Sequence, residues 1–185
     1  DDRPERYAFK NATIVVDSKN KITNGILLVE NGKIIEVGKN VKIPIGTVVT
    51  DLMGKYIYPS LVDLDSDYGM PEIKRDTRGG GRQTPQLETN KKGAFGWNQA
   101  IQPEIAASEL FVPNEKEAEE LRKYGFGTVL VHQHDGIVRG SGALVTLHDE
   151  SANKALLKDK ATAHFSFSKG TSTQTYPSSA MGVSA

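Results

Sequence analysis

Short apolar runs, separated by polar and glycine-containing breaks, dominate the first part of the chain. Runs rich in β-branched and apolar side chains fall at residues 12–16, 25–30, 33–37, 41–49 and 55–58. Asn31-Gly32 separates the second run from the third. An Asn-Gly pair in this setting predicts a hairpin, because both central turn positions require positive φ. The pattern predicts a small all-β unit over residues 1–58.

A different pattern begins at residue 59 and predicts strands that alternate with helix. Strands are expected at residues 61–65, 128–131, 143–147 and 161–167. Asn114, with Glu117 three residues on, resembles a capping box, and apolar residues at helical spacing predict a helix over residues 115–124. This interleaving favours α/β organisation.

Residues 66–113 carry no strong hydrophobic period. Apart from a short helix expected within residues 100–110, they predict a long loop that is either functional or disordered. This loop carries a run of basic residues with two aromatic residues: Arg75, Arg78, Arg82, Lys91 and Lys92, with Phe95 and Trp97. Such a loop either captures an anionic or aromatic ligand or is simply solvated.

Composition excludes several classes of protein. The 185 residues carry 23 basic and 23 acidic side chains, and this zero net charge argues against a dedicated nucleic-acid binder. No apolar run reaches the roughly 20 residues that a membrane-spanning helix needs, and no secretory signal is visible at the polar start. The absence of cysteine excludes disulfides, thiol nucleophiles and iron–sulfur clusters.

Two carboxylates lie at the end of the strand expected at residues 61–65 and just beyond it. Asp65 and Asp67 are two residues apart, so an extended backbone places them on one face. Paired carboxylates suit hard cations such as magnesium, calcium or manganese. The pair therefore predicts either a hard-metal site or two solvated side chains that remain from a lost site.

Histidines follow the next strand. His132 and His134 form a His-x-His pair on the expected rim of the sheet, but two histidines need a further ligand and the sequence assigns none. We therefore expect a rim pair without metal. His148 and His164 stand singly and are expected to serve packing or hydrogen bonding.

A glycine-rich segment, residues 135–142, adds Asp135 and Arg139 as candidates on the same rim. It lacks the Gly-Lys-Ser/Thr ending of a phosphate-binding loop, so a structural loop is expected. Ser141 does not stand in a Gly-x-Ser-x-Gly elbow, which makes it a weak candidate nucleophile.

Residues 54–67, GKYIYPSLVDLDSD, carry a resemblance to a known family. The segment resembles the junction between the β-sandwich and the first barrel strand of the amidohydrolase superfamily. Residues 135–142 and 165–170 resemble loops of its large exported bacterial members. The Asn31-Gly32 hairpin and residues 124–129 resemble the same family. The resemblance implies a β-sandwich that leads into a (β/α)8 barrel, a divalent metal that is typically zinc, hydrolysis of non-peptide C–N bonds and an exported, periplasmic location. The family's His-x-His positions hold Asp65 and Asp67 here, and its glycine is Ser60.

The expected division is an N-terminal β-sandwich part at residues 1–58 and a partial β/α barrel at residues 59–185, with the long loop at 66–113. A closed barrel usually needs about 250 residues, so we expect an N-terminal fragment of a longer protein. Its expected partners are the remainder of its own polypeptide or another subunit and an unidentified small substrate, without nucleic acid or membrane insertion.

Three functions remain open. The first is a metal-dependent hydrolase of C–N bonds whose metal site is degenerate in this segment, so that the fragment alone is inactive and no catalytic residue can be assigned. The second is a catalytically inactive scaffold or ligand-binding domain of a larger protein, which Asp65 and Asp67 favour. The third is an independent β-rich binding module that uses the loop from Arg78 to Trp97.

Overall fold

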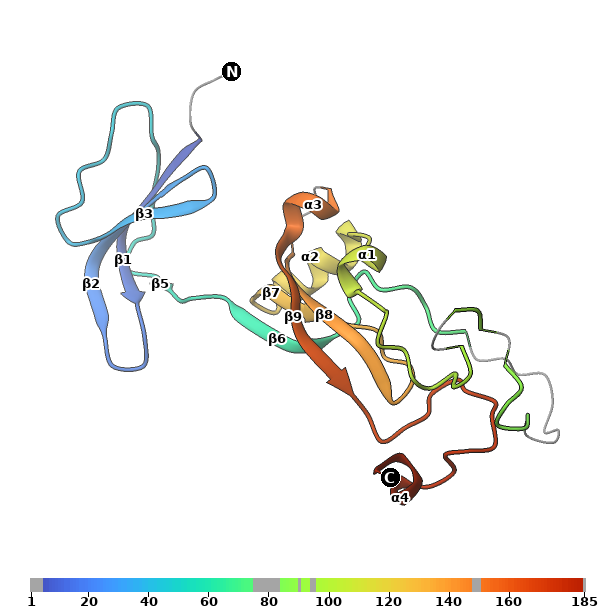
Figure 1. Cartoon of the computed structure of the whole chain (residues 1–185). Coiled ribbons are helices and arrows are strands. Elements are labelled where there is room, and N and C mark those ends of the chain that lie inside the picture. The colour runs from blue at the N-terminus through green and yellow to red at the C-terminus, as the bar shows by residue number, and fades with distance from the viewer. Residues whose placement is uncertain (1–4, 75–83, 90, 94–95, 148–150, 185) are drawn as a thin grey trace. The chain divides into compact units, whose positions relative to one another are not determined.

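The computed structural model describes residues 5–74, 84–89, 91–93, 96–147 and 151–184. The chain forms two compact units, Asp1–Pro59 and Ser60–Ala185, and each is described by itself (Figure 1). Among the described residues, no helix is long and apolar enough to cross a membrane.

The first unit is a five-stranded sheet with the order β3-β2-β1-β4, in which β5 also pairs with β1. Its strands are β1 (Arg6–Val15), β2 (Lys21–Glu30), β3 (Lys33–Gly38), β4 (Val48–Asp51) and β5 (Tyr56–Ile57). β1 is antiparallel to β2 and parallel to β4 and β5. The predicted all-β character of this region is confirmed.

The predicted hairpin is also confirmed. Asn31 and Gly32 have φ values of 48° and 73°, and Glu30 pairs with Lys33 across the turn. Asparagine and glycine tolerate this left-handed backbone better than other residues do.

One detail of the first unit differs from the prediction. Residues 41–47 lie outside the strands, and Gly46 has a φ of 85°, which is not extended backbone. Val41 is nevertheless buried, beside Ala8 and Leu28. The described strands of this unit form one sheet, and the predicted β-sandwich part stays a prediction.

The second unit contains a four-stranded sheet with the order β6-β7-β8-β9. Its strands are β6 (Leu61–Ser66), β7 (Phe126–Val131), β8 (Val138–Thr146) and β9 (Leu156–Phe165). Its helices are α1 (Ala107–Leu110), α2 (Glu115–Lys123), α3 (Ala152–Ala155) and α4 (Ala180–Ser184).

The sheet is mixed, and the described residues do not form a closed barrel. β6 and β7 are parallel, and α2 lies in the connection between them, whereas β8 is antiparallel to both β7 and β9. The physical reason is the length of the connections. A parallel return needs a dozen or more residues, and residues 132–137 are too few to carry one between β7 and β8.

The predicted helix start is confirmed at α2. The Asn114 side chain accepts a hydrogen bond from the Glu117 backbone N–H at 3.3 Å, as an N-cap does. The helix ends before Gly125, where φ is 91°.

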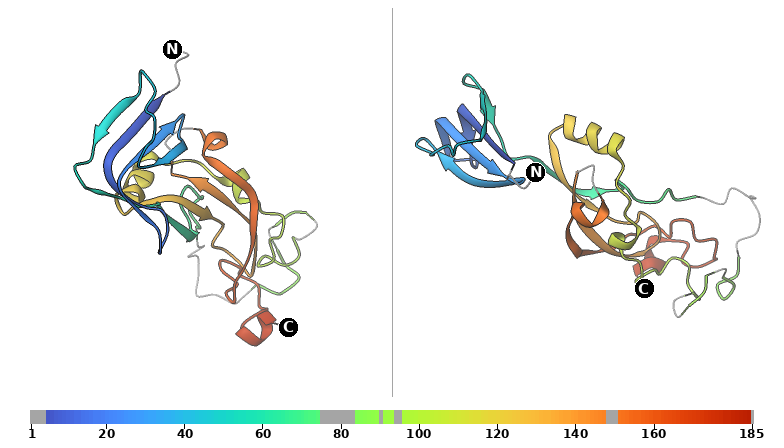
Figure 2. Two further views of the ribbon diagram at one scale, coloured as in Figure 1. Left: turned by 90° about the vertical axis from the view of Figure 1, so that its left-hand side faces the viewer. Right: turned by 90° about the horizontal axis from the view of Figure 1, so that it is seen from above.

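Figure 2 shows the ribbon of the second unit from two further sides. One face of its sheet carries the core: Val129, Val131 and Val145 are fully buried and pack with Phe111, which follows α1, and with Ala118 of α2. Because strand side chains alternate between faces, Leu130 and Gly142 lie on the opposite face.

Part of the predicted long loop is held against β8. Isolated bridges pair Ile101 with Val138 and Ala106 with Ser141. The predicted glycine-rich loop is itself largely strand, since residues 138–142 belong to β8. Gly140 has a φ of 81°, and a side chain there would overlap the Ile105 carbonyl, so this glycine permits the close approach of the two segments.

Candidate metal centre

Three side chains meet at one edge of the second sheet. Asp65 is the penultimate residue of β6, and His132 and His134 directly follow β7. Parallel strands present their carboxyl ends at the same edge, which is where sites form in α/β sheets. A backbone hydrogen bond of 3.2 Å from His132 N–H to the Ser66 carbonyl links the two strand ends.

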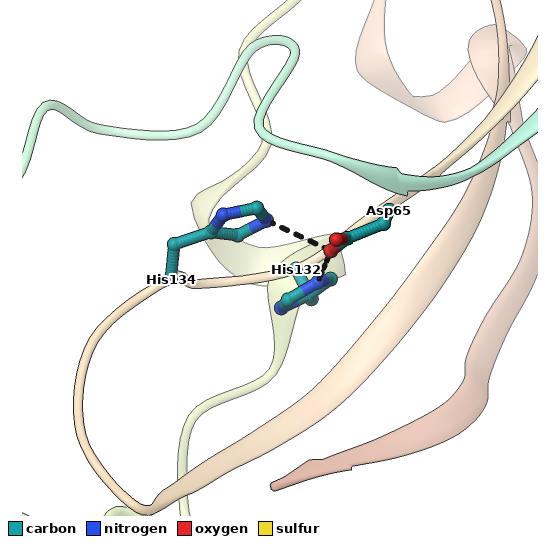
Figure 3. Close-up of side chains that lie close together, drawn as sticks. All are labelled: Asp65, His132 and His134. Atoms are coloured by element: carbon teal, nitrogen blue, oxygen red, sulfur yellow. Dashed lines mark hydrogen bonds and ion pairs between the residues drawn. The ribbon is translucent and has the colours of Figure 1, made fainter. Parts of the chain in front are cut away.

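Both imidazoles approach one carboxylate oxygen (Figure 3). The Nε2 atom of His132 lies 2.6 Å from Oδ1 of Asp65, and Nε2 of His134 lies 3.4 Å from the same oxygen. Within the part of the chain that the structure describes, these residues form a group whose ligand atoms all lie within 4.8 Å of one another. The sequence assigned no third partner to the histidine pair, and the structure brings Asp65 to it.

The histidine rings form a stack with His132 in the middle. Its ring centroid lies 4.1 Å from that of His134 and 3.6 Å from that of His164, and the interplanar angles are 23° and 10°. His132 is only 2% exposed. His164 belongs to β9 and packs beside Gly142 of β8, where a Cβ atom would lie 2.6 Å from Nε2 of His164.

The environment keeps the carboxylate ionised and two imidazoles neutral. The hydrogen bond from His132 is the main cause that lowers the pKa of Asp65. Burial, followed by the nearby His132, lowers the pKa of His134. The same causes lower the pKa of His164 to about 4. At neutral pH, His134 and His164 therefore carry no charge, and a neutral imidazole is the form that binds metals.

The other predicted rim residues have different positions. Asp67 lies beyond the end of β6 and is not a member of the three-residue group. Asp135 is buried and accepts hydrogen bonds of 2.7 Å from both the backbone N–H and the hydroxyl of Thr171. The Nε atom of Arg139 donates to the Gly136 carbonyl at 3.2 Å. Asp135 and Arg139 thus hold the surrounding loops together.

Only part of the predicted basic loop lies within the described residues. Arg75, Arg78, Arg82 and Phe95, together with His148, lie outside the described residues. Trp97 is 57% exposed. Lys91 is partly buried and donates from Nζ to the Gln99 carbonyl at 2.8 Å, so this cation serves the loop itself.

Sequence reasoning missed a buried glutamine that orders this loop. Gln174 is 0% exposed, and its Nε2 donates to the carbonyls of Gln86, Glu88 and Trp97. Its Oε1 accepts from the Gln99 backbone N–H at 2.8 Å. No local pattern marks this residue, because the partners of its side chain are all distant in sequence.

No family model and no curated protein matches the chain. Among solved structures, an amidohydrolase from Thermotoga maritima MSB8 superposes with a TM-score of 0.65 and 24% identity, covering 96% of this chain and 44% of that one. The chain has part of an amidohydrolase-like fold. It spans less than half the length of that amidohydrolase. A second amidohydrolase shows 30% identity over only 32% of this chain, with a TM-score of 0.30, and supports no inference.

Proposed function

We propose that this chain is part of an amidohydrolase-like hydrolase that acts on non-peptide C–N bonds. The observation that carries the proposal is the convergence of Asp65, His132 and His134 at the carboxyl ends of the parallel strands β6 and β7. Sites in α/β folds form at this edge. The fold similarity to an amidohydrolase supports the same reaction class.

The donor atoms at this edge fit the metal that such hydrolases use. Two imidazole nitrogens and one carboxylate oxygen are the ligand types of many catalytic zinc sites, which keep a further position open. A divalent ion supplies Lewis-acid assistance to hydrolysis when it is bound. Asp65, His132 and His134 are the residues that would hold it in this chain.

The protein's own residues shape the surroundings of the site. The backbone N–H of Asp65 donates to Oδ1 of Asp63 at 3.1 Å, which orders the end of β6. Asp135, which follows His134, accepts hydrogen bonds from Thr171, a residue of the segment that follows β9 in the sequence. Such support limits the motion of the histidine-bearing segment and keeps its side chains oriented toward a substrate.

We infer that the remainder of the polypeptide or another subunit completes the site. β6 is an edge strand of its sheet, and Leu61, Val62 and Leu64 on it are more than half exposed. Exposed apolar side chains on an unpaired edge favour contact with a further strand or helix. The substrate in this proposal is a small molecule, and the chain alone is expected to be inactive.

One observation favours a second function, that of an inactive scaffold or ligand-binding domain. In the segment that resembles the amidohydrolase junction, the two histidine positions hold Asp65 and Asp67. A protein that lost its catalytic metal in this way would retain the fold and bind a ligand without turnover.

Hydrolysis by the polypeptide that the gene encodes distinguishes the two functions. A panel of cyclic amides, imides and amidines is assayed with zinc present and after chelation. The hydrolase proposal predicts turnover of at least one substrate, with kcat/KM reduced at least about tenfold in His134→Ala and little changed in Asp67→Ala. A well-folded protein that binds members of the panel and turns over none supports the scaffold function and contradicts the hydrolase.

A further inference from the structure

A cavity of about 520 Å³ lies between the residues that follow β6 and the start of α2. Its volume is within the range of small-molecule sites, which is roughly 300–1,000 Å³. None of the described residues that line it belongs to the group of Asp65, His132 and His134. The cavity therefore has the size of a ligand site and shares no residue with the candidate metal centre.

The walls of this cavity are largely apolar. Met70 and Pro71 come from the segment after β6, whereas Leu110 is the last residue of α1 and Val112 and Pro113 follow it. Val112 is 68% exposed, and the Met70 and Leu110 side chains are only partly buried. An apolar ligand that covers these side chains removes them from water, which favours binding. Ligand sites typically combine such walls with a small number of polar groups.

The two walls are fixed relative to each other. The Val112 N–H donates to the Gly69 carbonyl at 2.9 Å. The neighbouring side chains Tyr68 and Phe111 are buried, with ring centroids 5.5 Å apart. Gly69 has a φ of 65°, and a Cβ atom there would lie 2.6 Å from both the Phe111 ring and the Val112 carbonyl oxygen. The cavity is thus preformed, which reduces the entropic cost of binding a ligand.

The charged groups of the cavity are both acidic. Glu115 and Glu117, in the first turn of α2, line it, and none of the described residues that line it is basic. Among the described residues, neither carboxylate has an ion-pair partner, whereas Glu119 of the same helix lies 2.9 Å from Nζ of Lys123. Two uncompensated carboxylates beside an apolar surface favour a cationic ligand and disfavour an anionic one.

We propose that this cavity binds a small organic cation with an aliphatic body and an ammonium or guanidinium group. The aliphatic body covers Met70, Leu110 and Val112. The cationic group lies beside Glu115 and Glu117, whose charge it compensates. A concave cavity of this volume is typical of small-molecule sites. Binding here is independent of the proposed hydrolysis, because it requires neither the metal nor turnover.

Methionine-methyl NMR on the 185-residue chain tests this site. The sequence contains three methionines, of which Met70 lines the cavity, so Met53 and Met181 serve as internal controls. The probes are n-hexylammonium, hexanol and hexanoate. We expect hexylammonium to shift the Met70 methyl signal saturably and to leave the other two signals in place. Hexanol should bind about fivefold more weakly, as expected for the loss of exposed ion pairs, and hexanoate more weakly still.

Substitutions separate the contribution of charge from that of the apolar wall. Glu115→Gln combined with Glu117→Gln should reduce the affinity for hexylammonium about fivefold. Val112→Lys should abolish the Met70 shift, because it places a cation on the apolar wall. Glu120→Gln is the matched control, since Glu120 is an exposed carboxylate of α2 that does not line the cavity. Far-ultraviolet circular dichroism checks that each variant is folded.

Three results would overturn the proposal. The first is the absence of a saturable Met70 shift with hexylammonium. The second is equal affinity for hexylammonium and hexanoate, or a loss in Glu120→Gln as large as in the double variant, since the two lining carboxylates would then have no specific part. The third is much tighter binding of a lysine–leucine peptide than of hexylammonium, which would assign the cavity to a protein partner. None of these measurements depends on zinc or on hydrolysis.

Discussion

His164 of β9 stacks on His132 with ring centroids 3.6 Å apart and an interplanar angle of 10°. The two rings come from elements on either side of β8, and Gly142 of β8 leaves the space that His164 occupies. The stack links a solvent-facing edge strand to the proposed metal ligands. His164 is therefore a positioning residue for His132, and its effect on metal binding can be measured.

Removal of the His164 ring is expected to weaken zinc binding. Without the stacked ring, His132 gains freedom to leave its orientation toward Asp65. We expect His164→Ala to lower zinc affinity about tenfold, in the range seen for groups that orient metal ligands. His164→Phe retains a flat ring and should preserve most of the affinity. Equal losses in both variants, measured by calorimetry, would contradict a role through stacking.

A side chain at Gly142 is expected to displace the stack. A Cβ atom there would lie 2.6 Å from Nε2 of His164 and 2.7 Å from Oγ1 of Thr162. We expect Gly142→Ala to reduce the free energy of unfolding by about 1–3 kcal/mol, as overpacking does. The cost should shrink in the His164→Ala background, because the clashing ring is then absent. Additive costs in this double-mutant cycle, measured by urea unfolding, would show that the two positions do not interact.

Gln174 is expected to control the order of the loop that precedes α1. In Gln174→Leu, the carbonyls of Gln86, Glu88 and Trp97 lose their donor, at a cost of about 1–3 kcal/mol in unfolding free energy. Amide hydrogen exchange at Gln99 should accelerate, since its N–H loses the Gln174 acceptor.

The comparison variant is Gln174→Glu, which loses the donor and places a buried carboxylate beside three carbonyl oxygens. Its cost in unfolding free energy is expected to be at least as large as that of Gln174→Leu. Unchanged unfolding free energy and unchanged exchange at Gln99 in both variants would show that the Gln174 side chain does not order this loop.

Asn114 is expected to stabilise α2 as its N-cap. Its side chain accepts from the Glu117 N–H, so Asn114→Ala should cost about 1 kcal/mol in thermal or urea unfolding. Asn114→Asp retains the acceptor and should cost little. A loss in Asn114→Asp as large as that in Asn114→Ala would argue against capping as the cause.

The sequence was most informative where the physics is local. The Asn31-Gly32 turn and the Asn114 cap depend on backbone preferences within a few residues, and both were predictable. The antiparallel course of β8 was not, because a strand pattern does not state which neighbour it joins or in which direction. The glycines of residues 138–142 resembled a loop, whereas at Gly140 and Gly142 the missing side chains make room for other segments.

The individual residues of the candidate site were predictable from the sequence, but their proximity in space was not. Asp65, His132 and His134 were each recognisable at strand ends. The link between them depends on β6 lying beside β7, a pairing between residues far apart in sequence. Asp67 was expected to share the role of Asp65, yet the strand ends at Ser66 and the three-residue group does not include it. The position of His164 on His132 likewise follows only from the order of the strands.

Anomalous X-ray diffraction at the zinc absorption edge, from crystals of the zinc-loaded chain, shows directly whether Asp65, His132 and His134 bind zinc. We expect one strong peak at about 2.0–2.2 Å from Nε2 of His132, Nε2 of His134 and a carboxylate oxygen of Asp65. A peak at other residues, or no peak in that position at full zinc loading, would contradict it.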